Sequence, residues 1–254
     1  MNLSSLTNFN TSSQLSSSQT STQAASSTSQ VSRTITSVDA RLQTQLDITS
    51  AQLSSFGKLK SAVSDTQLAA RALGNLKTSS TAADIKTALQ SLVTRFNTAI
   101  TTAHSTATSS SGALMSSSNA NRVSRDLNRA LANTPAAMDA LKKIGLKPQA
   151  DGTLTFDTAK FDAAQQKDAS FVQNTLAQIG QALDKTAANE LASGGGVSDA
   201  MSALNQQSTT LKAHQSALLA AVQKLSTTQS AWGSSTSPSS AYSAFGVAAY
   251  QSNG

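Results

Sequence analysis

The chain has 254 residues and a formal net charge of +6, with 13% charged and 4% aromatic residues. Globular proteins usually carry about 25% charged residues. Here Ser, Thr, Ala and Gln fill the difference, which favours long helices packed side by side over one thick core. There is no cysteine, which excludes disulfides and thiolate metal sites, and no stretch approaches the roughly 20 apolar residues of a membrane span.

Residues 1–32 are largely Ser, Thr and Gln. The first ten residues have neither a basic start nor a continuous apolar run, so they do not have the features of a Sec signal peptide. The composition of residues 1–32 predicts a segment without fixed structure. Both a plain linker or tail and an export segment fit this composition.

From Arg33 to Lys77 the sequence predicts one long helix, because two columns of residues recur at heptad spacing for about six repeats. The seam is weak in its middle, where polar residues replace apolar ones. The first column holds Ile35, Leu42, Thr49, Phe56, Val63 and Ala70, and the second holds Val38, Gln45, Gln52, Leu59, Thr66 and Leu73.

Shorter helices are expected in the middle of the chain. Apolar residues at helical spacing predict helices over 83–107, 119–143 and 171–191. The second of these is interrupted at Thr134-Pro135, because proline removes a backbone donor and clashes with the preceding turn. Residues 109–118 are predicted to form a polar linker.

A helix end, a tight hairpin and a new helix are predicted between residues 141 and 162. Gly145 can take the left-handed conformation that stops a helix. An Asp-Gly pair then predicts a two-residue hairpin turn. The return strand alternates Leu and Phe with Thr, and the next aspartate is placed to cap a helix that starts at Thr158. The predicted hairpin residues are Asp151, Gly152, Leu154, Phe156 and Asp157.

A second heptad run follows the flexible turn 194–196, with Ser193 or Ser198 available as a cap. Its first column holds Val197, Leu204, Leu211, Leu218 and Leu225, and its other column holds Met201, Ser208, Gln215 and Val222. An amphipathic helix is marginal in water without a partner, so we expect the two heptad runs to pack together in antiparallel fashion. The predicted packing seam comprises Ile35, Leu42, Phe56, Val63, Val197, Leu204, Leu211, Leu218 and Leu225.

These elements predict a mainly α fold: an elongated antiparallel helical bundle or coiled-coil stalk with one small β-hairpin and disordered termini. The expected organisation is a disordered export or linker segment over 1–32, a helical stalk domain over 33–231 with the hairpin near 146–157, and a flexible tail over 232–254. The tail prediction depends on the run of Gly, Ser and Pro after Trp232.

The sequence contains few of the residue patterns that are typical of an enzyme active site. Glu190 is the only glutamate, and His104 and His214 are isolated from each other and from any local carboxylate pattern. No phosphate-binding glycine motif is present, and the glycines at 194–196 suit a hinge. We therefore predict no catalytic, cofactor-binding or metal site.

A basic surface is the main alternative. Arg122, Arg125 and Arg129 share one helix face, and three lysines follow between 142 and 147. This pattern fits an acidic protein partner or a nucleic acid. No aromatic residues that could stack on bases are interleaved with it, so a solvated helix face is favoured over nucleic-acid binding.

The order of residues in 141–164, "L-x-x-I-G-L…D-G-T-L-x-F-D-x-x-K-F-D-A-A", resembles the bacterial flagellar filament cap family, also called hook-associated protein 2. The match is specific because one short segment combines the turn residues, the alternation of apolar and polar residues in the return strand and the capping aspartate of the next helix. The segment from Gln52 to Val63 resembles the first long helix of the family, and Leu92–Asn97 is similar to its F-V-x-x-Y-N element. The resemblance spans about residues 40–230. The amino-terminal signature of the family, its outer β-rich domains and its carboxy-terminal aromatic helix have no counterpart.

The resemblance implies a structural component of the bacterial flagellum, exported by the flagellar type III apparatus to an extracellular place at the filament tip. There, cap proteins form a homo-oligomeric ring and assist flagellin assembly for motility. Two alternatives stay open: another exported axial protein or a shortened capping modulator, and, in a different class, a basic nucleic-acid-associated helical protein. No small-molecule substrate and no membrane partner are expected.

Overall fold

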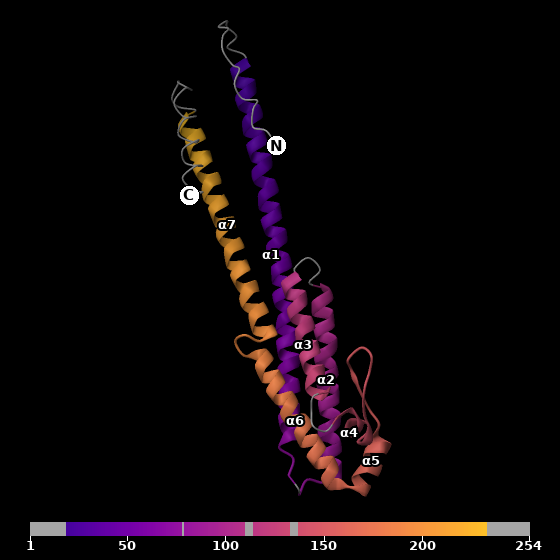
Figure 1. Ribbon diagram of the computed structural model, residues 1–254. Helices are drawn as coiled ribbons and strands as arrows, with labels where there is room; N and C mark the ends of the chain where they lie inside the picture. Colours follow the sequence, from indigo (N-terminus) through magenta and orange to yellow (C-terminus); the bar gives the residue numbers. More distant parts are fainter. Residues whose placement is uncertain (1–18, 78, 110–113, 133–136, 233–254) are drawn as a thin grey trace, which may run out of the picture. The chain divides into compact units, whose positions relative to one another are not determined.

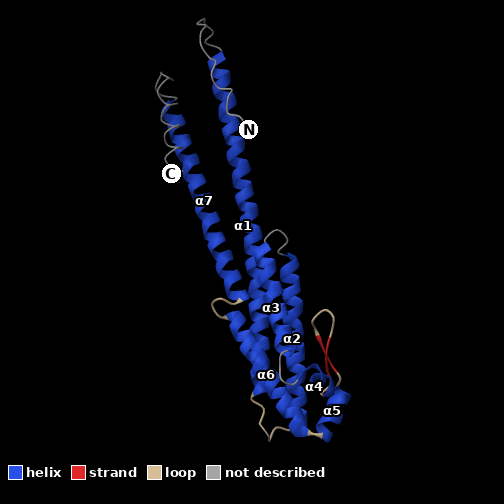
Figure 2. Cartoon of the chain, in the orientation of Figure 1, coloured by secondary structure: helices blue, strands red, loops and turns tan. Residues whose placement is uncertain are grey.

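The computed structural model describes residues 19–77, 79–109, 114–132 and 137–232. Within these ranges the chain forms seven helices and one two-stranded antiparallel sheet (Figures 1 and 2). The mainly α class with a single small hairpin, predicted from the sequence, is therefore confirmed. The predicted disorder of residues 1–18 and of the tail after Trp232 lies outside the described residues.

The elements follow the predicted order closely. The helices are α1 (Gln19–Gly74), α2 (Ala82–Ser109), α3 (Leu114–Ala132), α4 (Ala137–Lys143), α5 (Thr158–Lys167), α6 (Ala169–Leu191) and α7 (Gly196–Trp232), and the strands are β1 (Leu146–Pro148) and β2 (Leu154–Phe156).

Two boundaries differ from the prediction. Helix α1 begins at Gln19, so residues 19–32, for which the composition predicts no fixed structure, belong to a helix. Neither Gly nor Pro occurs between residues 19 and 56, and an existing helix adds further turns at low cost. Helix α3 begins at Leu114, within the predicted polar linker.

The chain divides into two compact units. The smaller unit holds residues up to Thr44 and from Ala213 onward, and the larger unit holds Gln45–Lys212. The domain boundaries predicted from composition, between residues 32 and 33 and between 231 and 232, stay predictions.

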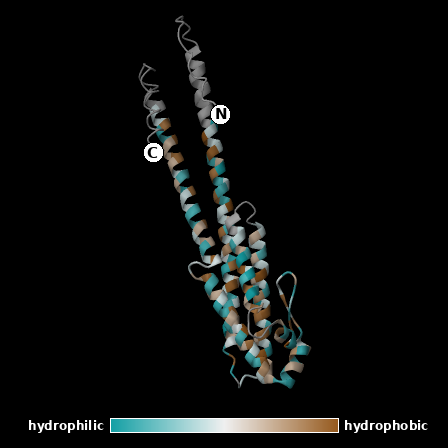
Figure 3. Cartoon of the chain, viewed as in Figure 1, coloured by the Kyte–Doolittle hydropathy of each residue, from teal (hydrophilic) through white to brown (hydrophobic). Residues whose placement is uncertain are grey.

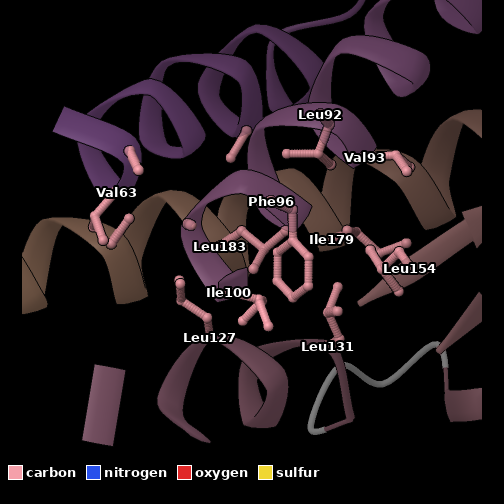
Figure 4. Close-up of a cluster of buried hydrophobic side chains, with 14 of the residues drawn as sticks. Val63, Leu92, Val93, Phe96, Ile100, Leu127, Leu131, Leu154, Ile179 and Leu183 are labelled. Atoms are coloured by element: carbon pink, nitrogen blue, oxygen red, sulfur yellow. The ribbon is translucent and has the colours of Figure 1, made fainter. Parts of the chain in front are cut away.

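The larger unit has one continuous hydrophobic core. Side chains from α1, α2, α3, α6 and β2 converge in it, with Phe96 of α2 near its centre (Figure 4). The helices contribute mainly Leu, Ile, Val and Ala at helical spacing, which explains why the amphipathic pattern located them correctly. The largest fully buried side chains are Phe56, Phe96, Phe161, Leu59, Leu73, Ile85, Leu89, Leu92, Ile100, Leu127, Leu131 and Leu141.

Helices α1 and α6 cross with their backbones in close contact. A Cβ atom on Gly180 would lie 2.5 Å from the Gly74 nitrogen and 2.6 Å from the Ala70 carbonyl oxygen. Beside this crossing, Arg71 Nη2 and Asp184 Oδ1 form an ion pair at 3.1 Å. Gly180 is therefore the residue that permits this approach, since any larger side chain would meet main-chain atoms.

In the smaller unit, the first part of α1 and the last part of α7 lie side by side and run antiparallel (Figure 1). Gln215 Nε2 bridges the two helices, at 3.4 Å from Asp39 Oδ1 and 3.4 Å from Gln43 Oε1. The heptad runs at the two ends of the sequence thus pair in this unit, as their apolar stripes require.

Candidate interaction surfaces

The hairpin is held by turn chemistry that the sequence predicts. Gly152 has φ +82°, and Thr153 donates to Asp151 Oδ1 from its backbone nitrogen at 2.9 Å and its hydroxyl at 2.7 Å. These hydrogen bonds stabilise the charged carboxylate and lower the pKa of Asp151 from its ordinary value. The strands pair Leu146 with Phe156 and continue to Pro148 with Leu154.

Both ends of the hairpin are anchored to the helices that flank it. Gly145, at φ +81°, accepts a hydrogen bond from the Asp157 backbone nitrogen at 2.8 Å. The Asp157 side chain is the N-cap of α5 and accepts from the Lys160 nitrogen at 3.0 Å. The rings of Phe156 and Phe161 meet edge to face with centroids 5.6 Å apart.

Asn97 of α2 fixes the hairpin to the bundle. Its Nδ2 donates to the Leu154 carbonyl at 2.8 Å, and its Oδ1 accepts from the Leu154 nitrogen at 2.7 Å. The amide thereby satisfies the outward-facing backbone groups of β2 as a third strand would. The sequence indicates only that Leu92–Asn97 is similar to a family element, and it gives no role for Asn97.

The tip of the hairpin lies against α3. A Cβ atom on Gly152 would be 2.6 Å from Asn128 Nδ2, and this amide group donates to the Ser124 carbonyl at 2.9 Å. Gly152 is thus required by its positive φ, and any larger residue there would also displace the Asn128 side chain. The hairpin is a packed part of the larger unit, because β2 lies against α2 and its tip against α3.

The predicted packing seam falls into two groups. In the larger unit its members are buried: Phe56, Val63, Val197, Leu204 and Leu211. In the smaller unit its members are only half-buried: Ile35, Leu42, Leu218 and Leu225.

The half-buried seam residues of the smaller unit, together with Val38 and Val222, form a surface that we call the terminal stripe. Val38 is 38% exposed. Among the described side chains at 33–44 and 213–228, no hydrophobic residue is buried. Figure 3 shows hydrophobic residues recurring along both helices of this unit. Two helices alone leave this stripe partly in contact with water, which disfavours an isolated pair.

The basic face of α3 is largely engaged within the fold. Arg122 Nη2 donates to the Gly194 carbonyl at 2.8 Å, and Arg129 Nη1 lies 3.0 Å from Asp126 Oδ1. Arg125 is exposed. Because two of the three arginines contact carbonyl or carboxylate groups, the face has less free positive charge than the sequence suggests.

Side chains arranged for catalysis or metal binding are few in the described part of the chain. His104 Nε2 lies 3.1 Å from Ser124 Oγ, but Ser124 is buried on α3. Residues 19–77, 79–109, 114–132 and 137–232 contain no cluster of three or more His, Asp or Glu side chains suited to a metal ion. None of the helices in these ranges combines the length and hydropathy of a membrane span.

A family model described as the C-terminus of flagellar hook-associated protein 2 matches residues 24–238. The chain belongs to this family. The match includes the described parts of both units from residue 24 to residue 232, with the hairpin that carries the sharpest sequence resemblance. No curated protein sequence and no solved structure matches the chain significantly.

The family assignment confirms the resemblance to the filament cap proteins that the residues between 141 and 164 indicate. The chain is therefore a flagellar cap-like protein of the hook-associated protein 2 family, which is a family of structural flagellar proteins.

Proposed function

We propose that this protein is a cap component that forms a homo-oligomeric ring at the tip of the flagellar filament and assists flagellin assembly there. Its membership in the hook-associated protein 2 family supports this place and this role. The short connection over 75–81 joins α1 to α2 directly. The family's outer β-rich domains, which are usually inserted between these helices, therefore have no room at this point of the chain.

The observation that carries the proposal is the terminal stripe. Its Ile, Leu and Val side chains recur along two paired helices without becoming buried, so further helices must cover them to complete a hydrophobic seam. We take the occupant to be the same unit of other copies of this chain. Few charges accompany the stripe: only Arg33, Asp39, Arg41, His214 and Lys224 occur at 33–44 and 213–228.

The proposed mechanism is mechanical. Copies associate through the terminal stripe, and the larger unit supplies a folded body whose shape is set by its own core. Such an assembly acts on flagellin through packing surfaces and not through bond chemistry. It needs neither a cofactor nor a small-molecule substrate.

The test is a deletion of the gene in its flagellated host, followed by assays of motility and of monomeric flagellin in the medium. The deletion strain is expected to swim poorly and to release flagellin monomers, and the wild-type gene is expected to restore both properties. Leu218→Asn places an amide in the terminal stripe and is expected to fail in this restoration. Gln223→Ala, at an exposed position of the same helix, is the matched control and is expected to succeed.

Purified protein provides the second readout. Wild type and Gln223→Ala are expected to sediment as oligomers, and Leu218→Asn as a monomer with an unchanged helical spectrum. A deletion strain that swims normally and releases no flagellin would contradict the capping role. A strain that swims but makes filaments of altered length would instead indicate a capping modulator.

A further inference from the structure

The junction between α6 and α7 contains a buried carboxyl group. Glu190, the only glutamate of the chain, is 4% exposed. Its Oε2 accepts a hydrogen bond from the Gly196 nitrogen at 2.8 Å. Gly196 is the first residue of α7, and the first N–H groups of a helix have no partner within the helix. Glu190 therefore fastens the start of α7 to the end of α6.

A second carboxylate shares the same arginine. Arg122 Nε lies 3.9 Å from Glu190 Oε1 and 3.7 Å from Asp126 Oδ2. Arg122 Nη2 also donates to the Gly194 carbonyl at 2.8 Å. One guanidinium thus faces two carboxyl groups and the connecting turn, and two like charges that share one partner disfavour ionisation of both acids.

The junction leaves little room for water. A Cβ atom on Gly196 would lie 2.8 Å from Glu190 Oε2, 3.1 Å from the Asn119 carbonyl oxygen and 3.1 Å from Val123 Cγ2. Gly194 is held on the other side, where its nitrogen donates to Asp199 Oδ1 at 3.0 Å. The Glu190 carboxyl group therefore has neighbouring protein atoms where an exposed carboxylate has water.

The charged groups around Glu190 act in opposite directions. Arg122 and the Gly196 N–H favour its ionised form, whereas burial and Asp126 favour its protonated form. Burial has the largest effect, and the net result raises the pKa of Glu190 above the ordinary value of a glutamate. Arg129 pairs with Asp126, and Asp199 is bound to the turn.

We propose that the α6–α7 junction is a proton-operated latch, in which protonated Glu190 donates to Asp126 through one oxygen and holds the first N–H of α7 with the other. Loss of this proton to solvent leaves two carboxylates against one guanidinium and loosens the first turn of α7. The direction of the pH dependence of stability follows from the raised pKa of Glu190. An acid whose pKa is raised on folding binds its proton more tightly in the folded state, so this stability is complete below the unfolded pKa and is lost as pH rises through the folded pKa.

The test uses the full chain with ¹³C-labelled glutamate, which gives a single side-chain carboxyl signal because Glu190 is the only glutamate. The signal is followed between about pH 4 and pH 8, alongside exchange of the Gly196 amide corrected for its intrinsic rate. The carboxyl midpoint is expected above that of a glutamate in an unstructured peptide. Protection of the amide is expected to fall as pH passes that midpoint, by up to about tenfold for each unit of the shift.

Three variants separate the latch from a general effect of pH. Glu190→Gln keeps the shape of the side chain but cannot ionise, so its Gly196 protection is expected to be flat over this range. Asp126→Asn removes the second carboxylate and is expected to lower the Glu190 midpoint. Asp184→Asn removes a carboxylate of α6 that pairs with Arg71 outside the junction, and is expected to keep the wild-type profile. A Glu190 midpoint at or below that of the peptide, or pH-independent protection in the wild type, would overturn the proposal.

Discussion

Single polar side chains decide where the hairpin lies on the bundle. The two hydrogen bonds between Asn97 and the Leu154 backbone, at 2.8 and 2.7 Å, satisfy a donor and an acceptor that are partly shielded from water. A buried backbone group without a partner costs about 1–3 kcal/mol, so this one amide fixes the position of β2 against α2. At the tip of the hairpin, the absence of a side chain on Gly152 leaves space for the Asn128 amide of α3.

Gly152→Val is expected to strain the hairpin. Valine would have to adopt the positive φ of this position, at a cost of about 1–3 kcal/mol, and its Cβ would collide with Asn128 Nδ2. Hydrogen exchange should show faster exchange over residues 144–162, while the long helices of the larger unit keep their protection. Wild-type protein with unprotected amides at 146–157 would contradict the premise that this segment is an ordered hairpin.

Gly57→Ala provides the control for glycine replacement as such. Gly57 lies within α1, and nothing lies within 4 Å of the place a Cβ would take. Alanine there is expected to leave the protein as stable as before or to stabilise it by about 0.5–1 kcal/mol. A comparable loss of stability in Gly57→Ala and Gly152→Val would mean that the effect at Gly152 is not specific to its turn.

The residues that local patterns reveal are those whose partners are near in sequence. Asp151 and Asp157 act on backbone groups within three residues, so turn and cap preferences located them. Asn97 acts on Leu154, and Glu190 on a glycine beyond the α6–α7 turn. Either Ser193 or Ser198 was expected to be available as the cap of α7. The Glu190 carboxylate instead takes the Gly196 N–H, because tertiary packing brings it to the helix start.

At the scale of elements, residues of α7 that occupy equivalent heptad positions differ in how deeply they are buried. Val197 and Leu204 belong to the core of the larger unit, whereas Leu218 and Leu225 are only half-buried in the smaller unit. The spacing predicts one uninterrupted seam because it records only periodicity. Which part of a seam is covered depends on how many helices surround it, and that is a property of the tertiary fold.

Leu211→Ala tests the covered part of this helix. Leu211 is 7% exposed and lies near the end of the larger unit, outside its main core cluster. Its replacement is expected to cost about 2 kcal/mol, the lower limit for a buried leucine, measured by urea denaturation. Leu219→Ala changes the same side chain at a position that is 55% exposed, and should cost much less. Equal midpoints for wild type and Leu211→Ala would show that the seam at Leu211 contributes no core packing.

At the scale of the whole chain, the two units differ in what they can do alone. Residues 45–212 contain every member of the hydrophobic core, so this unit has the burial that independent stability requires. The smaller unit has polar bridges through Gln215 and a half-buried apolar stripe. The sequence predicted the helices of both units, but not this division, because composition changes little across residues 44 and 212.

The amino-terminal segment is expected to act in export and not in folding. Deletion of residues 2–30 leaves residues 45–212 and their core intact, so thermal unfolding of the larger unit should be unchanged. Secretion through the flagellar apparatus should be lost, because a segment rich in Ser, Thr and Gln is expected to contribute recognition by the export apparatus and no core packing. A shorter deletion of 2–18, which ends before α1, should have the same effect, whereas removal of 241–254 should not. Immunoblots of medium and cell fractions give the answer, and normal amounts of the protein lacking residues 2–30 outside the cell would contradict the export role.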